Sequence, residues 1–128
     1  MARVLLVDDN ERNLRFLRDG LEAHGYTVAT AASGPEALES AGTLNPDVIL
    51  VDVQMPGMSG TETMKRFKAS GALDHVPILA VTALAMKGDE AQLLEAGFDG
   101  YLSKPVTLAE MLRALHEVLG DNRQAGES

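Results

Sequence analysis

The chain has no cysteine, so disulfide bonds are excluded and cysteine usage leaves the redox compartment undetermined. It also has no long hydrophobic run, because no segment approaches the ~20 apolar residues that a transmembrane helix needs. The apolar run near the amino terminus stops after Val7, at two aspartates, which is too short for a secretory signal peptide. These absences predict a cytoplasmic protein with no membrane insertion.

Positive charge is scarce. Eleven lysines and arginines face 19 aspartates and glutamates, which gives a net charge of −8. Nucleic-acid binding needs a basic face, so this balance argues against DNA or RNA as a direct partner. The fingerprints G-x-G-x-x-G and G-x-x-x-x-G-K-S/T are absent, so nothing indicates a nucleotide site. The histidines share no metal-ligand spacing, and we assign them no chemistry: His24, His75 and His116.

The stretch 47–60, DVILVDVQMPGMSG, organises the rest of the chain. Its apolar run 48–51 is too short for most helices and rich in β-branched residues, which predicts a strand buried on both faces. Asp52 ends this run, so a carboxylate is expected at the carboxyl end of a central strand. Ser59 with Glu62 three residues later predicts the start of a helix. Ligands of open α/β sheets bind beyond such strand ends, so we expect Asp52 to be the reactive residue.

Strand and helix patterns alternate along the chain. The strands are expected over 3–7, 26–31, 47–52, 77–82 and 99–103. The helices are expected around Leu14–His24, from Ser33 to near Gly42, over about 60–69, over roughly 86–96, and over 108–119. This alternation predicts an α/β fold, a doubly wound five-stranded parallel sheet with helices on both faces. We expect one domain over residues 1–120 and a disordered tail over 121–128.

Polar side chains stand at the carboxyl ends of four predicted strands: Asp8 and Asp9, Asp52, Thr82, and Lys104. Adjacent strands lie only ~4.8 Å apart, so these groups can converge on one site. Three neighbouring carboxylates repel one another, and a hard divalent cation such as Mg²⁺ resolves the conflict. A lysine and a hydroxyl beside them suit a phosphate group. The set predicts phosphoryl transfer through an aspartyl phosphate.

Each of these residues also has an ordinary structural explanation. The two aspartates after the first strand could form a solvated N-cap cluster with Asn10, and Asp52 could simply terminate its strand. Thr82 could satisfy a hydrogen bond in the core, and Lys104 could be a surface lysine. Taken singly, these explanations are as good as the functional one. They weaken jointly, because all four positions fall at strand ends on the same edge of the sheet.

Four segments in order, VLLVDDN, VILVDVQMPGMSG, PILAVTA and YLSKP, resemble the signatures of response-regulator receiver domains, the CheY-like family. The resemblance covers about residues 1–120. The longer stretches VDDNERNLRFL and VTALAMKGDEAQLLEAGFDGYLSKP look most like DivK-type single-domain regulators and the receivers of hybrid histidine kinases. The resemblance implies the flavodoxin-like strand order 2-1-3-4-5, which sets the ends of strands one, three, four and five side by side.

The resemblance also implies residue roles at the acidic edge. Asp52 is the expected phosphoacceptor and a metal ligand. Asp9 is expected to bind Mg²⁺ directly, Asp8 to act near it, often through water, and Gln54 to contribute its backbone carbonyl.

Further roles concern the phosphoryl group and the switch. Thr82 and Lys104 are expected to contact the phosphoryl group. The Lys104–Pro105 bond is expected to be cis, and Tyr101 matches the family's aromatic switch residue. Its ordinary alternative is packing on an edge strand.

The function implied is a single-domain response regulator of a two-component phosphorelay, since no output domain follows residue 120. It would take a phosphoryl group from a histidine kinase or a histidine phosphotransfer protein. It would then change its affinity for a target through the face of helix four, strand five and helix five. The protein would catalyse its own phosphorylation and dephosphorylation, but its product is a conformational state rather than a released compound.

Two other functions compete with this hypothesis. A metal-dependent phosphohydrolase with an aspartate nucleophile needs a second acid near the nucleophile and a cap segment. Here Val53 and Gln54 follow Asp52, and no segment is long enough for a cap. An adaptor that binds partners without phosphorylation would not need the complete acidic set.

Overall fold

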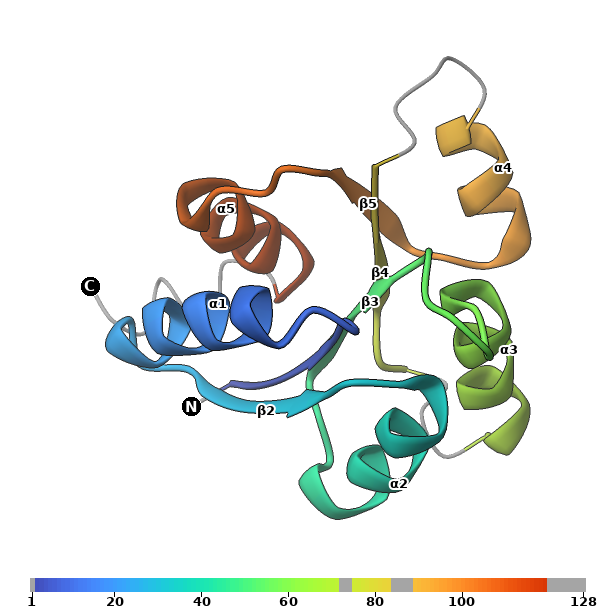
Figure 1. The fold of residues 1–128 in the computed structure, drawn as a ribbon, viewed down its shortest axis with the longest axis horizontal. Helices are drawn as coiled ribbons and strands as arrows, with labels where there is room; N and C mark the ends of the chain where they lie inside the picture. Colours follow the sequence, from blue (N-terminus) through green and yellow to red (C-terminus); the bar gives the residue numbers. More distant parts are fainter. Residues whose placement is uncertain (1, 72–74, 84–88, 120–128) are drawn as a thin grey trace.

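The computed structural model describes residues 2–71, 75–83 and 89–119. Within them, five strands alternate with five helices, as the sequence predicts (Figure 1). The strands are β1 (Arg3–Val7), β2 (Thr27–Ala31), β3 (Val48–Asp52), β4 (Ile78–Thr82) and β5 (Gly100–Ser103). The helices are α1 (Glu11–Ala23), α2 (Gly34–Leu44), α3 (Gly60–Ser70), α4 (Asp89–Ala96) and α5 (Leu108–Leu119).

The strands form one parallel sheet in the order β2-β1-β3-β4-β5, which confirms the predicted order 2-1-3-4-5. All five residues of β3 are buried, and so are all five of β4. This burial on both faces explains why their sequences are almost entirely apolar rather than alternating. The edge strand β5 alternates between half-buried and exposed residues.

Successive side chains of each strand point to opposite faces of the sheet, and each face has its own helices. Leu5 and Ile49 point to the face where α2, α3 and α4 contribute buried residues such as Phe67. Leu6 and Leu50 point to the other face, against the apolar stripes of α1 and α5. In Figure 1, α1 and α5 accordingly lie on one side of the sheet and the other three helices on the opposite side.

One predicted helix end is wrong. The second helix does not stop near Gly42 but continues through it to Leu44. Gly42 is exposed and is tolerated inside the helix, where glycine costs only ~1 kcal/mol relative to alanine. The left-handed residue that ends α2 is Asn45, with φ 56°. Asparagine adopts this conformation more readily than most residues, so it serves as the cap.

Side-chain caps start the helices that flank the site. Asn10 accepts a hydrogen bond from the backbone N–H of Asn13 at the start of α1. Thr107 and Glu110 form the full reciprocal capping box of α5. The bonds that the N–H and hydroxyl of Thr107 donate to the Glu110 carboxylate lower the pKa of that carboxyl. The first part of the predicted fourth helix and the predicted tail over 121–128 lie outside the described residues. Within the described ranges, no helix combines the length and apolarity needed to cross a membrane.

Candidate functional site

Three carboxylates meet at the carboxyl edge of the sheet. β1 and β3 are neighbours, so the residues that follow Val7 come beside Asp52 at the end of β3. One carboxylate oxygen from each of Asp8, Asp9 and Asp52 lies within 4.8 Å of the other two. Asp52 is 1% exposed and Asp8 6%, whereas Asp9 is exposed to solvent. The cluster therefore has a buried floor and one solvent-facing carboxylate.

Lys104 supplies the positive charge of the site. Its Nζ lies 3.1 Å from Oδ2 of Asp52 and 4.0 Å from Oδ2 of Asp8. The residue reaches this place because its backbone N–H donates to the carbonyl of Thr82, 2.8 Å away, just past the β4–β5 ladder. One cation thus sits against two buried carboxylates, with Asp52 as its nearer partner.

The charge state of Asp52 reflects opposing effects. Burial, the largest effect, raises the pKa of its carboxyl above the ordinary value. Hydrogen bonds from Lys104 and from the backbone N–H of Gln54, at 3.1 Å, lower it, and the neighbouring Asp8 raises it again. The effect of burial exceeds that of the hydrogen bonds, so ionisation of Asp52 costs free energy in the folded protein. A further positive charge near the carboxylate would reduce this cost.

Asp8 is held by donors that the sequence analysis did not identify as part of the site. Its Oδ1 accepts from the backbone N–H of Asn10, and its Oδ2 accepts from the side-chain amide of Asn13, both at 2.9 Å. The sequence pattern predicts only a helix-cap role for Asn10 and predicts no role for Asn13. The available signal was an amide residue in the first turn of the helix that directly follows the paired aspartates.

The turn after Asp52 depends on a close backbone approach by Gly60, the first residue of α3. Gly60 donates its N–H to the carbonyl of Val53 at 3.0 Å. A Cβ on Gly60 would lie 2.3 Å from the carbonyl oxygen of Asp52 and 2.6 Å from the Cα of Val53. These atoms belong to the backbone and cannot rotate away, so only glycine fits without moving the phosphoacceptor candidate.

We therefore expect Gly60→Ala to destabilise the protein by about 1–3 kcal/mol through overpacking. Gly42→Ala is the matched control, because Gly42 is an exposed helical glycine and, apart from its chain neighbours and the backbone of its own helix, no atom lies within 4 Å of an added Cβ. That change should stabilise α2 by up to ~1 kcal/mol. Urea denaturation of both variants measures the two effects. Equal stabilities for the two variants would show that the Asp52 turn does not require glycine.

The remaining predicted site residues take the following positions. Thr82 is fully buried at the end of β4, one residue beyond the register partner of Asp52. The Lys104–Pro105 peptide bond is cis. Tyr101 lies on the edge strand β5 and is 37% exposed. The structure thus brings Thr82 and Lys104 to the edge where the three aspartates meet, while Tyr101 lies on the outer strand.

The donor set at this edge fits a hard divalent cation. Mg²⁺ prefers carboxylate oxygens together with water and phosphate oxygens. The Asp8, Asp9 and Asp52 oxygens offer the first of these, and Asp9 keeps the cluster open to solvent. The net charge of −8 adds to the advantage of a cation here.

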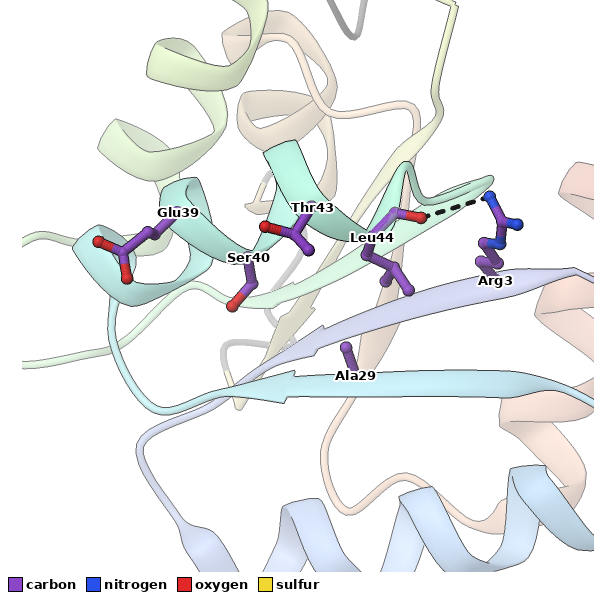
Figure 2. Close-up of a pocket in the computed structure, with 6 residues that line it drawn as sticks. All are labelled: Arg3, Ala29, Glu39, Ser40, Thr43 and Leu44. Carbon is purple, nitrogen blue, oxygen red and sulfur yellow. Dashed lines mark hydrogen bonds between the residues drawn. The ribbon is translucent and has the colours of Figure 1, made fainter.

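A larger hollow in the described part of the chain lies away from the acidic site. It measures about 580 Å³ and lies between α2 and the β1–β2 part of the sheet, lined by Arg3, Ala29, Glu39, Ser40, Thr43 and Leu44 (Figure 2). The Arg3 guanidinium donates to the carbonyl of Leu44 at 3.5 Å and borders one end of the hollow. Arg3 is the first residue of β1, whereas Asp8 and Asp9 follow the last residue of that strand. The hollow is therefore separate from the acidic site.

Comparison with known proteins places these features in context. Residues 4–116 match the response regulator receiver domain family. The polar-differentiation response regulator DivK of Brucella ovis is 43% identical over 118 residues, covering 92% of this chain and 96% of that protein. The chemotaxis protein CheY4 of Vibrio cholerae has a TM-score of 0.87 and 36% identity, over 92% of this chain and 98% of that one. The receiver domain of a Pseudomonas aeruginosa sensor histidine kinase, with a magnesium ion coordinated in its active-site cleft, has a TM-score of 0.83 and 36% identity, over 93% and 98% of the two chains.

Proposed function

This chain belongs to the response regulator receiver domain family, and on that premise we propose that Asp52 accepts a phosphoryl group from a phosphohistidine. The donor would be a histidine kinase or a histidine phosphotransfer protein. The observation that carries the proposal is the meeting of Asp52, 1% exposed, with two more carboxylates and the Lys104 ammonium. A lone strand-ending aspartate would need neither.

The proposed transfer exchanges one bond for another. A carboxylate oxygen of Asp52 attacks phosphorus, a P–O bond forms, the P–N bond of the phosphohistidine breaks, and the histidine nitrogen takes the bonding electron pair. Lys104, 3.1 Å from Asp52, would then pair with a phosphoryl oxygen, as would the Thr82 hydroxyl. Lys104 already contacts the Asp52 carboxylate, so its part in the transfer needs little reorganisation.

A bound Mg²⁺ would supply charge neutralisation between the carboxylates and the phosphoryl oxygens. We propose Asp8, Asp9, Asp52 and the Gln54 carbonyl as the residues that hold it, with Asp8 acting at least partly through water. The carboxylate oxygens within 4.8 Å of one another support this assignment. The Gln54 N–H donates to Asp52 at 3.1 Å, and this backbone contact supports the proposed role of Gln54.

The readout we propose is a change of shape rather than a released product. Receiver domains interact with histidine kinases and downstream effectors. Here Thr82 would move toward the phosphoryl group while Tyr101 turns inward, reshaping the face of α4, β5 and α5 for a target protein. Thr82 is buried and Tyr101 is 37% exposed, which supports a coupled movement of these two side chains. The expected cytoplasmic location, and the division into a domain over 1–120 and a tail, stay predictions.

Incubation with acetyl phosphate and Mg²⁺ tests the proposal. The expected result is one hydroxylamine-sensitive phosphoryl group per chain, which mass mapping assigns to Asp52. EDTA should suppress the reaction, because the carboxylates then repel the incoming anion. Label on any other residue, or equal label in EDTA, would refute the assignment.

The two competing functions give different results in simple assays. A phosphohydrolase would turn over small phosphate esters many times per chain, whereas a switch would show only its own single phosphorylation and slow loss. An adaptor that works without phosphorylation would bind its partner equally with and without acetyl phosphate. Neither outcome is expected for this site.

A further inference from the structure

Asn13 connects the first helix to the acidic cluster. It lies in the first turn of α1 and is half-buried. Its backbone N–H donates to Oδ1 of Asn10 at 3.0 Å, which caps the helix. Its side-chain amide points elsewhere and donates to Oδ2 of Asp8 at 2.9 Å. The cap therefore uses the backbone of Asn13, and its side chain is left to contact the carboxylate cluster.

Both oxygens of Asp8 thereby accept hydrogen bonds from the cap and the first turn of α1. Oδ1 accepts from the backbone N–H of Asn10 and Oδ2 from the Asn13 amide, both at 2.9 Å. Lys104 is farther away, 4.0 Å from Oδ2. Asp8 is 6% exposed, so its oxygens rely on protein donors rather than on bulk solvent. The orientation of this carboxylate hence depends on Asn13 more than on Lys104.

We infer that Asn13 is a positioning residue that sets the affinity of the acidic site for Mg²⁺. The inference rests on the proposed function of Asp8, Asp9 and Asp52 as a metal site. Hydrogen bonds to a ligating carboxylate fix its orientation before the metal arrives. The Asn13 amide also carries no charge, so it orients Asp8 without competing with the cation electrostatically.

The choice of variant follows from the space around Asn13. Asp8 and Asn13 form the polar part of the lining of a small hollow of about 20 Å³, whose other lining residues are all apolar. A hollow of this size admits one water molecule, so Asn13→Ala could let water donate to Asp8. Asn13→Leu has a similar shape, cannot donate, and fills the space beside Leu14 and Leu17. The leucine variant is therefore the stricter test.

Isothermal titration calorimetry with Mg²⁺ alone, on the full chain, measures the effect. Loss of such an outer hydrogen bond usually costs 10–100-fold in metal affinity, and we expect about a tenfold higher Kd in Asn13→Leu. Asn13→Ala should show a smaller increase of the same sign. A Kd within twofold of wild type in both variants would overturn the inference.

Asn10→Ala is the matched control. It removes the cap of the same helix and should lower the melting temperature in EDTA, but it keeps both donors to Asp8. We expect it to bind Mg²⁺ with the wild-type Kd. An equal rise of Kd in Asn10→Ala and Asn13→Leu would show that α1 stability, and not the amide, controls the metal. If the wild-type chain binds no Mg²⁺, the proposed metal site itself fails, and the inference falls with it.

Discussion

Asp52→Asn is expected to take no phosphoryl group from acetyl phosphate and, in EDTA, to melt a few degrees above the wild type. The variant keeps the shape of the side chain but removes a charge that is 1% exposed and faces Asp8. Burial and this neighbour raise the pKa of the Asp52 carboxyl, so ionisation at neutral pH costs the folded state free energy. A relief of ~1 kcal/mol corresponds to about 3–5 °C for a domain of this size.

The pH dependence gives this prediction a second measurement. The pKa of Asp52 in the folded state lies above its ordinary value of 3.8. At pH values between 3.8 and the folded pKa, Asp52 therefore keeps a proton in the folded state that it loses in the unfolded chain. The contribution of Asp52 to stability is therefore full below pH 3.8 and declines as the pH rises through the folded pKa. The advantage of Asp52→Asn should be present at neutral pH and shrink on acidification. An advantage that is constant with pH would point to packing instead of charge.

Mg²⁺ should stabilise the wild type more than it stabilises Asp52→Asn. A ligand that binds only the folded state adds RT ln(1 + [L]/Kd) to the free energy of unfolding. Wild type should gain more from millimolar Mg²⁺ than Asp52→Asn, which has lost a ligand. Thermal melts in EDTA and in Mg²⁺ measure both gains. If Asp52→Asn melts lower than wild type in EDTA, and Mg²⁺ shifts both proteins equally, the three carboxylates do not form one metal site.

Lys104→Ala is expected to have the opposite effect on the metal-free protein. The change leaves the buried Asp52 and Asp8 carboxylates without the cation that lies 3.1 and 4.0 Å from them. Breaking a buried pair from one side costs several kcal/mol, and since the Lys104 side chain is 28% exposed, we expect about 1–3 kcal/mol. The melting temperature in EDTA should fall, and Mg²⁺ should recover more of the stability than it adds to wild type.

The Lys68–Asp99 ion pair provides a matched control. Its nitrogen and oxygen lie 3.9 Å apart, but both side chains are more than two-fifths exposed. An exposed pair of this kind contributes ~0.2–1 kcal/mol at most, so Lys68→Ala should change the melting temperature little. Comparable losses for Lys68→Ala and Lys104→Ala would mean that the buried carboxylates do not depend on Lys104.

Lys104→Ala also tests whether Lys104 couples the phosphoryl group to partner binding. Lys104→Ala should still bind Mg²⁺, because the aspartates remain, yet respond weakly to phosphorylation. Binding of the phosphorylated variant to its partner measures the response. Undiminished binding would show that Lys104 is not the residue that couples the phosphoryl group to the rest of the domain.

The order and type of the elements, and the edge at which the polar residues meet, could be predicted from the amino-acid sequence. These features depend on local periodicity and on residue chemistry, which are visible in one dimension. The apolar run ending at Asp52 predicts a central strand, and β3 is indeed buried along its whole length. The predicted end of α2 was wrong, because the sequence pattern does not distinguish a glycine tolerated inside a helix, such as Gly42, from a glycine that caps one. The residue that ends α2 in the left-handed conformation is Asn45.

The contacts between individual side chains could not be predicted in this way, because they depend on how the elements pack in three dimensions. The Lys104 ammonium lies nearer to Asp52 than to Asp8, and this depends on how β5 pairs with the rest of the sheet. Gly60 lies close to the backbone of Asp52, and this depends on how α3 packs. That Asn13 holds Asp8 depends on the angle at which α1 leaves β1. Such contacts join residues through space at distances of a few ångströms. Residue type and periodicity report which face a side chain occupies, but they do not report its nearest neighbour on that face.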